Sequence, residues 1–334
     1  MRIGFAIIGT GVIAHVHARA LLKNKNCKLI AVRSENKERA EEFAKKYEIK
    51  AYIDYEELLK DKDIQAVDIV TKNNKHAELG IKAANAKKHV LVEKPIDTNL
   101  DRAEQLIDAC KKNHVKLGVI SQKRFDKAIL LAKRIIDKKE LGKIESVKAN
   151  MKWHRTKEYY ESSGGWRSKQ DTSGGGVLII QAIHYIDLLS YLLGDAQSVK
   201  GELSYDYKME VEDGVHAYIK FKNTIKAEIE ATVTAPKTMP DTIEIKCEKG
   251  NILLYSHNGI HILKIHSRNL LKQIKNIRYL LYIKKGSIRE QIKDFTDSIN
   301  NNREPFVTGE DGFKTLKIIL SIYKSAKLKK EVKV

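Results

Sequence analysis

Residues 3–14 read Ile-Gly-Phe-Ala-Ile-Ile-Gly-Thr-Gly-Val-Ile-Ala, an apolar run that leads directly into a glycine-rich turn. The run predicts a buried strand over Ile3–Ile8, and helical apolar spacing predicts a helix over Ile13–Lys23. The turn matches G-x-G-x-x-G/A: Gly9 permits the bend, Gly11 lets the backbone approach a pyrophosphate, and Ala14 allows close helix–strand packing. The order of strand, glycine-rich turn and helix predicts a dinucleotide-binding turn. We expect the cofactor to contact Gly9, Thr10, Gly11, Val12 and Ile13.

Strand and helix patterns keep alternating beyond this turn. Short apolar runs predict four more buried strands, at Lys28–Val32, Ala66–Val70, His89–Val92 and Lys116–Ile120. Helical spacing predicts helices between them, at Lys37–Tyr47, Tyr55–Leu59, His76–Ala86 and Asn99–Lys112. Because strands that alternate with helices pair in parallel, we expect an α/β, doubly wound Rossmann domain over residues 1–121.

The pattern changes after Gln122, and we expect a second, α+β domain over residues 122–334. Its first predicted elements are a helix, a strand and a second helix, at Ala128–Lys138, Ile144–Met151 and Val177–Leu193. Period-two alternation then predicts strands at Glu212–Phe221, Ile225–Val233, Asp241–Glu248, Asn251–Tyr255 and Ile260–Ile265. Two helices close the chain, at Ser287–Asn300 and Glu310–Leu328. Most strands of this domain should therefore pair antiparallel.

The chain is strongly basic, with 62 Lys and Arg against 43 Asp and Glu, a net charge of +19 over 334 residues. Lysines are spread along the chain with acids interleaved, which is typical of solvated helix faces rather than of a nucleic-acid surface. No nucleic-acid-binding motif accompanies the charge, so we expect no nucleic-acid partner. The exception is Lys264–Lys285, a stretch with basic residues and no acids that could bind an anion.

Cysteine usage and the N-terminus indicate where the protein resides. Cys27, Cys110 and Cys247 are far apart and lack the paired spacing of a metal site or a disulfide framework. We therefore expect buried free thiols, no metal and a cytoplasmic protein. The N-terminus predicts a strand rather than a leader, and no apolar run approaches the ~18–20 residues that span a bilayer, so we expect no membrane partner.

The end of the second predicted strand bears on cofactor choice. NAD-binding versions of this fold place an Asp or Glu there to bind the ribose 2′-OH. Here Ser34 occupies that position beside Arg33, and a hydroxyl with a guanidinium suits a 2′-phosphate. This favours NADP slightly over NAD, although Glu35 would reach the ribose if the turn shifted by one residue.

Motifs spread along the chain resemble the Gfo/Idh/MocA oxidoreductases, which include glucose–fructose oxidoreductase and inositol dehydrogenase. Glu93-Lys94-Pro95 matches the family's catalytic Glu-Lys-Pro element. Residues 71–76, Thr-Lys-Asn-Asn-Lys-His, resemble its T-P-N-x-x-H turn with Lys72 in place of Pro, and residues 87–90 resemble G-K-H-V with Lys87 in place of Gly. Residues 174–176, Gly-Gly-Gly, and residues 182–187, Ala-Ile-His-Tyr-Ile-Asp, match the helix that carries the family's catalytic histidine. Residues 305–312 match a further recurrent element.

The resemblance implies an NAD(P)-dependent dehydrogenase whose second domain has an open antiparallel sheet that often mediates homo-oligomers, as dimers or tetramers. It places Lys94 beside the nicotinamide and the reacting hydroxyl, with His184 as general base, which suits an imidazole near neutral pH. Lys94 could itself be the proton-transfer group. Beyond the turn and Arg33 and Ser34, the implied cofactor-binding residues are Thr71, Asn73, His76, Glu93, Lys94 and Gln122. We also expect His17 and Arg124 to line the cofactor cleft.

One departure from the family concerns the residue four positions before the histidine. Many members carry Asp or Asn there, whereas this chain has Ile180, followed by Gln181. Isoleucine cannot bind a hydroxyl, and Gln181 is turned about 100° around an α-helix. Catalysis therefore depends more on His184 and Lys94, and an inositol-like substrate is disfavoured.

Tyr159-Tyr160 and Gly165-Trp166-Arg167 resemble a narrower branch in which some members oxidise the 3-hydroxyl of UDP-N-acetylglucosaminuronate, although Ser168 replaces a glycine. Arg167 could hold a carboxylate or phosphate, and Trp166 and Tyr160 could contact a sugar ring. The expected substrate is an anionic sugar, most simply a nucleotide-sugar acid. Its expected contacts are Lys94, Tyr160, Trp166, Arg167, Gln181 and His184. The alternatives are a dehydrogenase of a free sugar or polyol and a non-enzymatic NAD(P)-binding regulator.

Overall fold

The computed structural model describes residues 2–257, 260–267, 281–284 and 288–334. The chain divides into two compact units, and the division is not a single cut. One unit comprises Met1–Gln122 and Ser287–Phe313, and the other comprises Lys123–Gly286 and Lys314–Val334. The sequence-based domains, 1–121 and 122–334, meet one residue from the first division, whereas the return segment, residues 287–313, which the sequence assigned to the second domain, clusters with the first unit.

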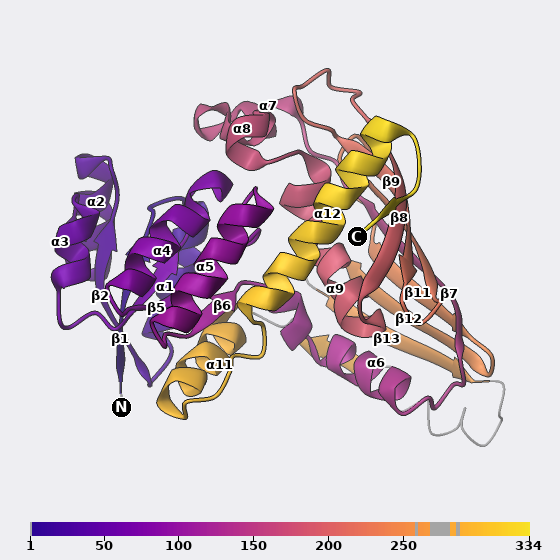
Figure 1. Cartoon of the computed structure of the whole chain (residues 1–334), viewed down its shortest axis with the longest axis horizontal. Helices are drawn as coiled ribbons and strands as arrows, with labels where there is room; N and C mark the ends of the chain where they lie inside the picture. The colour runs from indigo at the N-terminus through magenta and orange to yellow at the C-terminus, as the bar shows by residue number, and fades with distance from the viewer. Residues whose placement is uncertain (1, 258–259, 268–280, 285–287) are drawn as a thin grey trace. The chain divides into compact units, whose positions relative to one another are not determined.

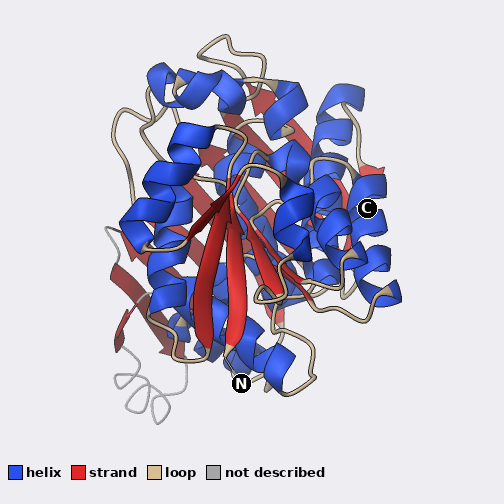
Figure 2. Cartoon of the chain, turned by 90° about the vertical axis from the view of Figure 1, so that its left-hand side faces the viewer, coloured by secondary structure: helices blue, strands red, loops and turns tan. Residues whose placement is uncertain are grey.

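The first unit is built on a parallel sheet of six strands, as far as the chain is described, with the order β3-β2-β1-β4-β5-β6. Its strands are β1 (Ile3–Ile8), β2 (Cys27–Arg33), β3 (Lys50–Tyr52), β4 (Ala66–Ile69), β5 (His89–Val92) and β6 (Leu117–Val119). Its α-helices are α1 (Val12–Leu22), α2 (Lys37–Tyr47), α3 (Tyr55–Lys60), α4 (His76–Asn85), α5 (Leu100–Lys112) and α11 (Ile288–Asn300). Figure 2 shows helices on either side of these strands. The order reverses between β1 and β4, where ligands bind in sheets of this kind.

The return segment belongs to the first unit because its apolar face completes that unit's core. Ile292 and Phe295 of α11 are buried with Ile3 and Phe5 of β1. The rings of Phe5 and Phe295 meet edge to face, with centroids 6.3 Å apart. The colours of Figure 1 show that this helix comes from late in the chain.

The second unit contains a sheet of nine strands, counted over the described residues, in the order β14-β13-β12-β11-β7-β10-β9-β8-β15. The strands are β7 (Ile144–Lys152), β8 (Ala196–Ser204), β9 (Gly214–Phe221), β10 (Lys226–Thr232), β11 (Asp241–Cys247), β12 (Gly250–His257), β13 (Ile260–Ser267), β14 (Leu281–Lys284) and β15 (Val332–Lys333). All pairs in this described sheet are antiparallel except β7 with β10. The predicted fold class, a Rossmann domain followed by an α+β domain with a mostly antiparallel sheet, is confirmed.

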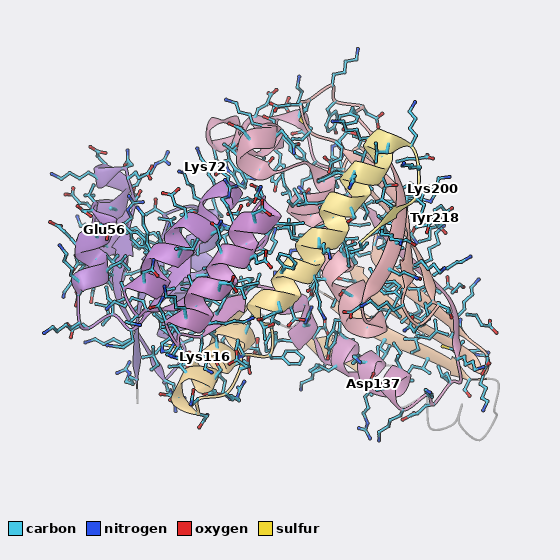
Figure 3. The ribbon with its side chains drawn as sticks, in the orientation of Figure 1. Glu56, Lys72, Lys116, Asp137, Lys200 and Tyr218 are labelled. Atoms are coloured by element: carbon cyan, nitrogen blue, oxygen red, sulfur yellow. The ribbon has the colours of Figure 1, made fainter. Side chains whose placement is uncertain are left out.

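The second unit has five α-helices among the described residues. They are α6 (Lys127–Asp137), α7 (Lys157–Glu161), α8 (Gln170–Ser173), α9 (Ile183–Leu193) and α12 (Gly309–Leu328), the last of which enters this unit at Lys314. Ile322 of α12 packs on Gly201 of β8. Lys200 and Tyr218, cross-strand partners in β8 and β9, point away from α12 (Figure 3). At these two positions the face turned away from α12 is exposed.

The predicted helix Val177–Leu193 differs from a regular α-helix at its start. Leu178–Ala182 form a π-helical turn that continues into α9. A wider turn changes the angle between consecutive side chains, so the 100° spacing assumed for Ile180 and Gln181 does not hold here.

One helical stretch, Gln170–Leu193, is long and apolar enough to cross a membrane, but 89% of its apolar window is buried inside the structure. Burial of this extent is what the core helix of a folded domain shows.

Candidate active site

The glycine turn after β1 has the geometry that an anion-binding turn needs. Gly9 has φ +118°, and a Cβ there would lie 2.2 Å from the Val70 carbonyl oxygen, so no other residue fits. Gly11 caps α1 without a side-chain hydrogen bond, and no acidic residue occupies the first turn. A Cβ on Gly11 would meet nothing within 4 Å. The N–H groups at the start of α1 are therefore open to a ligand, and these residues fit the pyrophosphate of a dinucleotide.

The start of α1 also leaves apolar surface uncovered. Val12 is 80% exposed and Ile13 is 46% exposed, although both are large apolar residues. Both lie beside the turn, where the sequence predicted cofactor contacts, and a bound dinucleotide would cover such a surface.

At the end of β2, Arg33 is held in place by its neighbours. Its Nε donates to the Ile53 carbonyl over 3.1 Å, and its guanidinium carbon lies 5.8 Å from the centre of the Tyr55 ring. Glu35, 83% exposed, lies 3.5 Å from Arg33 Nη1, and the hydroxyls of Thr10 and Ser34 are also 3.5 Å apart. Arg33 and Ser34 are thus adjacent to the glycine turn, with Glu35 on the solvent side.

A buried ionic network lies behind the glycine turn. His17 of α1 is fully buried, with Nδ1 2.7 Å from Asp68 Oδ2 and Nε2 3.1 Å from Glu93 Oε1. Burial alone would lower the pKa of His17, but the two carboxylates outweigh it and raise the pKa to about 10. The same imidazolium lowers the pKa of Glu93 against the opposing effect of burial. His17 is therefore a cation at neutral pH, held between the carboxyl groups of Asp68 and Glu93.

This network reaches the predicted catalytic lysine through Glu93. Glu93 Oε2 accepts from the backbone N–H of Lys94 over 3.0 Å, so one oxygen binds His17 and the other fixes Lys94. On the other side of the lysine, His76 Nδ1 lies 2.7 Å from the Pro95 carbonyl oxygen and Nε2 lies 3.3 Å from that of Thr71. The structure therefore places His76 and Glu93, both expected to bind cofactor, in contacts that position Lys94. Thr71 is half-buried and Asn73 is buried in the same turn.

Sequence reasoning missed Asp68, which lies in the middle of β4 and is fully buried. The signal was present, because a carboxylate inside the apolar run Ala66–Val70 needs a buried cationic partner.

In the second unit, the glycines before His184 make room for a carboxylate. A Cβ on Gly176 would lie 1.7 Å from the Glu212 carbonyl oxygen, and a Cβ on Gly175 would lie 2.0 Å from the Tyr323 hydroxyl. The Glu212 side chain accepts from the N–H groups of Gly176 and Leu178 over 2.7 and 2.9 Å, and from the Tyr323 hydroxyl over 2.9 Å. Burial raises the pKa of Glu212, and these hydrogen bonds partly offset the rise.

Glu212 thus satisfies the N-terminal donors of the helix that leads to His184. No local sequence signal identifies it, because it lies 36 residues from Gly176.

His184 itself is half-buried on α9, and the helix is anchored three residues later. Asp187 accepts two hydrogen bonds from Arg124, Nη2 to Oδ1 over 2.7 Å and Nε to Oδ2 over 2.9 Å. Arg124 is only 3% exposed. The Arg124 guanidinium is used in this buried ion pair, which anchors the helix that carries His184, and the expectation that Arg124 lines the cofactor cleft stays a prediction.

The predicted substrate residues lie in different environments. Tyr160 is fully buried and its hydroxyl donates to Gln181 Oε1 over 3.2 Å, so its ring is not a surface for a sugar. Gln181 is 4% exposed, and its Nε2 has no hydrogen-bond partner in the part of the chain that the structure describes. Trp166 and Arg167 are half-buried and stacked, with the guanidinium carbon 4.7 Å from the ring centre.

The remaining predicted residues are placed as follows. Lys94 follows β5 in the first unit and is half-buried, whereas His184 belongs to the second unit. Gln122 is half-buried at the end of the first unit's main segment, and its buried Oε1 has no partner among the described residues. Most of the basic stretch Lys264–Lys285 lies outside the described residues.

The doubly wound sheet, the open glycine turn and the fixed lysine after β5 define a dinucleotide-binding enzyme domain. Residues 3–121 match the family model "Oxidoreductase family, NAD-binding Rossmann fold", and residues 133–334 match "Oxidoreductase family, C-terminal alpha/beta domain". The chain belongs to the Gfo/Idh/MocA family of NAD-dependent sugar and polyol oxidoreductases. The resemblance stated from the sequence is confirmed.

Relatives in this family span several substrates. The chain is 30% identical to oxidoreductase P35 of Formosa agariphila, over 75% of this chain and 78% of that protein. It is 27% identical to myo-inositol 2-dehydrogenase of Thermotoga maritima, over 100% of this chain and 98% of that protein. Among solved structures, the WlbA dehydrogenase of Chromobacterium violaceum in complex with NADH and UDP-GlcNAcA has TM-score 0.89 and 25% identity, covering 100% of this chain and 96% of that chain.

The charge of His17 predicts a pH-dependent stability. Because its pKa rises from 6.5 to about 10 on folding, its contribution is complete below pH 6.5 and disappears as pH rises through about 10. We expect the free energy of unfolding of wild type to exceed that of His17→Gln by about 2–5 kcal/mol at pH 6.5, with the difference shrinking towards pH 10.

Denaturant titrations at several pH values measure this difference. His15→Gln on the same helix is the control, because burial and nearby cations lower the pKa of His15, so it stays neutral above pH 7. A difference between wild type and His17→Gln that is constant from pH 6.5 to 10 would contradict an imidazolium at this position.

Proposed function

We propose that the protein is an NAD(P)-dependent dehydrogenase that oxidises a secondary hydroxyl of an anionic sugar, most simply a nucleotide-sugar acid. The observation that carries the proposal is the position of Lys94. Its backbone is fixed on one side by Glu93 and on the other by the His76–Pro95 contact, at the carboxyl end of a Rossmann sheet. Such a position is where a reacting group meets a bound nicotinamide.

The chemistry follows from the residues. When bound, the oxidised nicotinamide accepts the hydride that leaves the substrate's C–H bond. The Lys94 ammonium holds the substrate hydroxyl oxygen and stabilises the alkoxide charge that develops on it. The His184 imidazole takes the hydroxyl proton, and in the reverse direction it returns that proton to the carbonyl oxygen.

Gln181 supports substrate binding from the buried side. Its Nε2 is a buried donor without a partner in the described structure, and leaving such a group unpaired costs about 1–3 kcal/mol. A substrate oxygen would satisfy it. Ile180 offers no such group, which disfavours the polyols that the family's inositol dehydrogenases use.

The catalytic roles predict a specific pattern of damage. His184→Asn should keep cofactor affinity and lower kcat by ~10²–10⁴, the effect of removing a positioned acid–base group. Lys94→Met should be at least as harmful, because it also removes the charge that stabilises the alkoxide. Stopped-flow or steady-state reduction of NAD(P)⁺ with a panel of sugars and UDP-sugar acids measures both.

Lys112→Met, an exposed lysine at the end of α5 in the same unit, is the control for lost charge. Full activity of Lys94→Met would contradict the proposal. Cofactor binding by wild type without hydride transfer to or from any sugar would instead favour a non-enzymatic regulator.

Cofactor choice rests on Arg33 and Ser34, which favour NADP slightly. If Arg33 binds a 2′-phosphate, Arg33→Ala should weaken NADPH binding by about 1.5–3 kcal/mol, the size of a charge-assisted hydrogen bond, and leave NADH nearly unchanged. Fluorescence titration with the two cofactors measures this, and NADH serves as the internal control. Equal losses for both would mean that Arg33 only supports the turn through Ile53 and Tyr55, and a wild type that prefers NADH would point to Glu35.

Two further parts of the proposal concern the setting of the enzyme. The three cysteines are buried free thiols, which supports a reducing, cytoplasmic environment. We also propose a homo-oligomer, a dimer or a tetramer, in line with the family. Nucleic acid and membranes are not among the proposed partners.

A further inference from the structure

Five side chains of the second unit form an alternating stack of aromatic rings and guanidinium groups. Arg155 lies over Trp153 and Tyr159, with its guanidinium carbon 5.0 and 5.8 Å from the two ring centres. Arg167 lies over Tyr159 and Trp166, at 5.0 and 4.7 Å. Tyr159 is therefore shared by both arginines. We call this group the ladder: Trp153, Arg155, Tyr159, Arg167 and Trp166. All five are half-buried, so each keeps a face or an edge in solvent.

The two cations of the ladder have no acidic partner among the described residues. Arg155 donates from Nη1 to the His154 carbonyl, and the other described contacts of both guanidinium groups are with rings. By contrast, Arg124 is paired with Asp187. A guanidinium has five N–H donors, so most donors of Arg155 and Arg167 remain available. The aromatic rings hold the two guanidinium groups in fixed planes and leave the N–H donors at their edges available. A guanidinium held in this way can donate two parallel hydrogen bonds to the oxygens of one phosphate.

The ladder is connected to the helix of His184 at two points. At one end, Trp153 Nε1 donates to Asp241 Oδ1 over 2.6 Å, and Asp241 also hydrogen-bonds Tyr185, the residue after His184. In the middle, Tyr159 is followed by Tyr160, whose hydroxyl donates to Gln181, three residues before His184. The ladder therefore belongs to the same part of the second unit as the proposed base and the unpaired Gln181 amide.

We propose that the ladder is a binding site for the diphosphate of a nucleoside-diphosphate sugar, with Arg155 and Arg167 each taking phosphate oxygens. This inference rests on the proposed function and adds Arg155, Trp153 and Tyr159 to its substrate residues. Two separate guanidinium groups suit two linked anionic groups, whereas one carboxylate needs only one bidentate arginine. The ring faces that the arginines leave uncovered suit a nucleobase or the apolar face of a sugar.

The test uses uridine 5′-diphosphate as the probe and calorimetric titration of the protein saturated with its reduced cofactor. Saturation keeps the probe out of the dinucleotide site. We expect wild type to bind the probe, Arg155→Gln and Arg167→Gln each to weaken binding about tenfold or more, and binding to weaken as salt rises. Arg155→Lys and Arg167→Lys, which keep the charge but lose the planar fork, should also bind more weakly than wild type.

The matched control is Arg134→Gln, which removes one exposed charge from α6 in the same unit and should leave the affinity unchanged. The proposal is overturned if wild type does not bind the probe, or if the ladder variants bind it as tightly as Arg134→Gln does. If a glutamine variant fails to fold, the affinity of the lysine variant at the same position is compared with that of Arg134→Gln instead.

The experiments distinguish failure of the proposed diphosphate site from failure of the proposed dehydrogenase activity. Wild type that transfers hydride to or from a sugar but does not bind uridine 5′-diphosphate would overturn the ladder proposal alone, because Lys94 and His184 lie outside the ladder. Lys94→Met, conversely, should keep the affinity for uridine 5′-diphosphate while losing hydride transfer. Loss of the diphosphate site with retained turnover of neutral sugars would leave the dehydrogenase and remove only this substrate class.

Discussion

The ion pair of His17 with Asp68 and Glu93 is the interaction on which the first unit's chemistry depends. One buried imidazolium joins α1, whose N-terminus carries the glycine turn, to β4 and to the end of β5, where Lys94 begins. Burying three ionised groups is expensive, and the network remains favourable only because each charge faces an opposite one at hydrogen-bond distance. The same contacts that offset this cost fix the glycine turn and Lys94, the proposed catalytic lysine, relative to each other.

The second unit uses a buried carboxylate for a related purpose. Glu212 binds the N–H groups of Gly176 and Leu178, and Arg124 and Asp187 anchor the helix beyond His184. Gly175 and Gly176 are required because any side chain there would overlap Tyr323 or Glu212. Close packing at the start of the helix thus explains two of the three glycines, Gly175 and Gly176. His184 is held in a fixed helix between two ionic contacts.

Features that depend on neighbouring residues in sequence could be predicted, and features that depend on distant contacts could not. The parallel strands, the turn at Gly9 and the helices of the first unit follow from local periodicity. Glu212, Tyr323 and the burial of Tyr160 depend on residues far apart in the chain, so no local pattern reveals them. β3 spans only Lys50–Tyr52 and has no buried residue, so it is too short to show an alternating pattern of apolar and polar residues. No feature of the amino-acid composition predicts the π-helical turn before His184. The angle of 100° between Ile180 and Gln181, which assumes an α-helix, therefore does not apply there.

The proposed reaction moves a hydride between a ring carbon of an anionic sugar and a nicotinamide. The most direct measurement follows deuterium by mass spectrometry, using a UDP-sugar acid deuterated on its ring carbons and the oxidised cofactor. We expect one deuterium in each reduced cofactor molecule and loss of that label from a single ring position. Reduced cofactor without deuterium, or no reduction with any UDP-sugar acid while neutral polyols react, would contradict it.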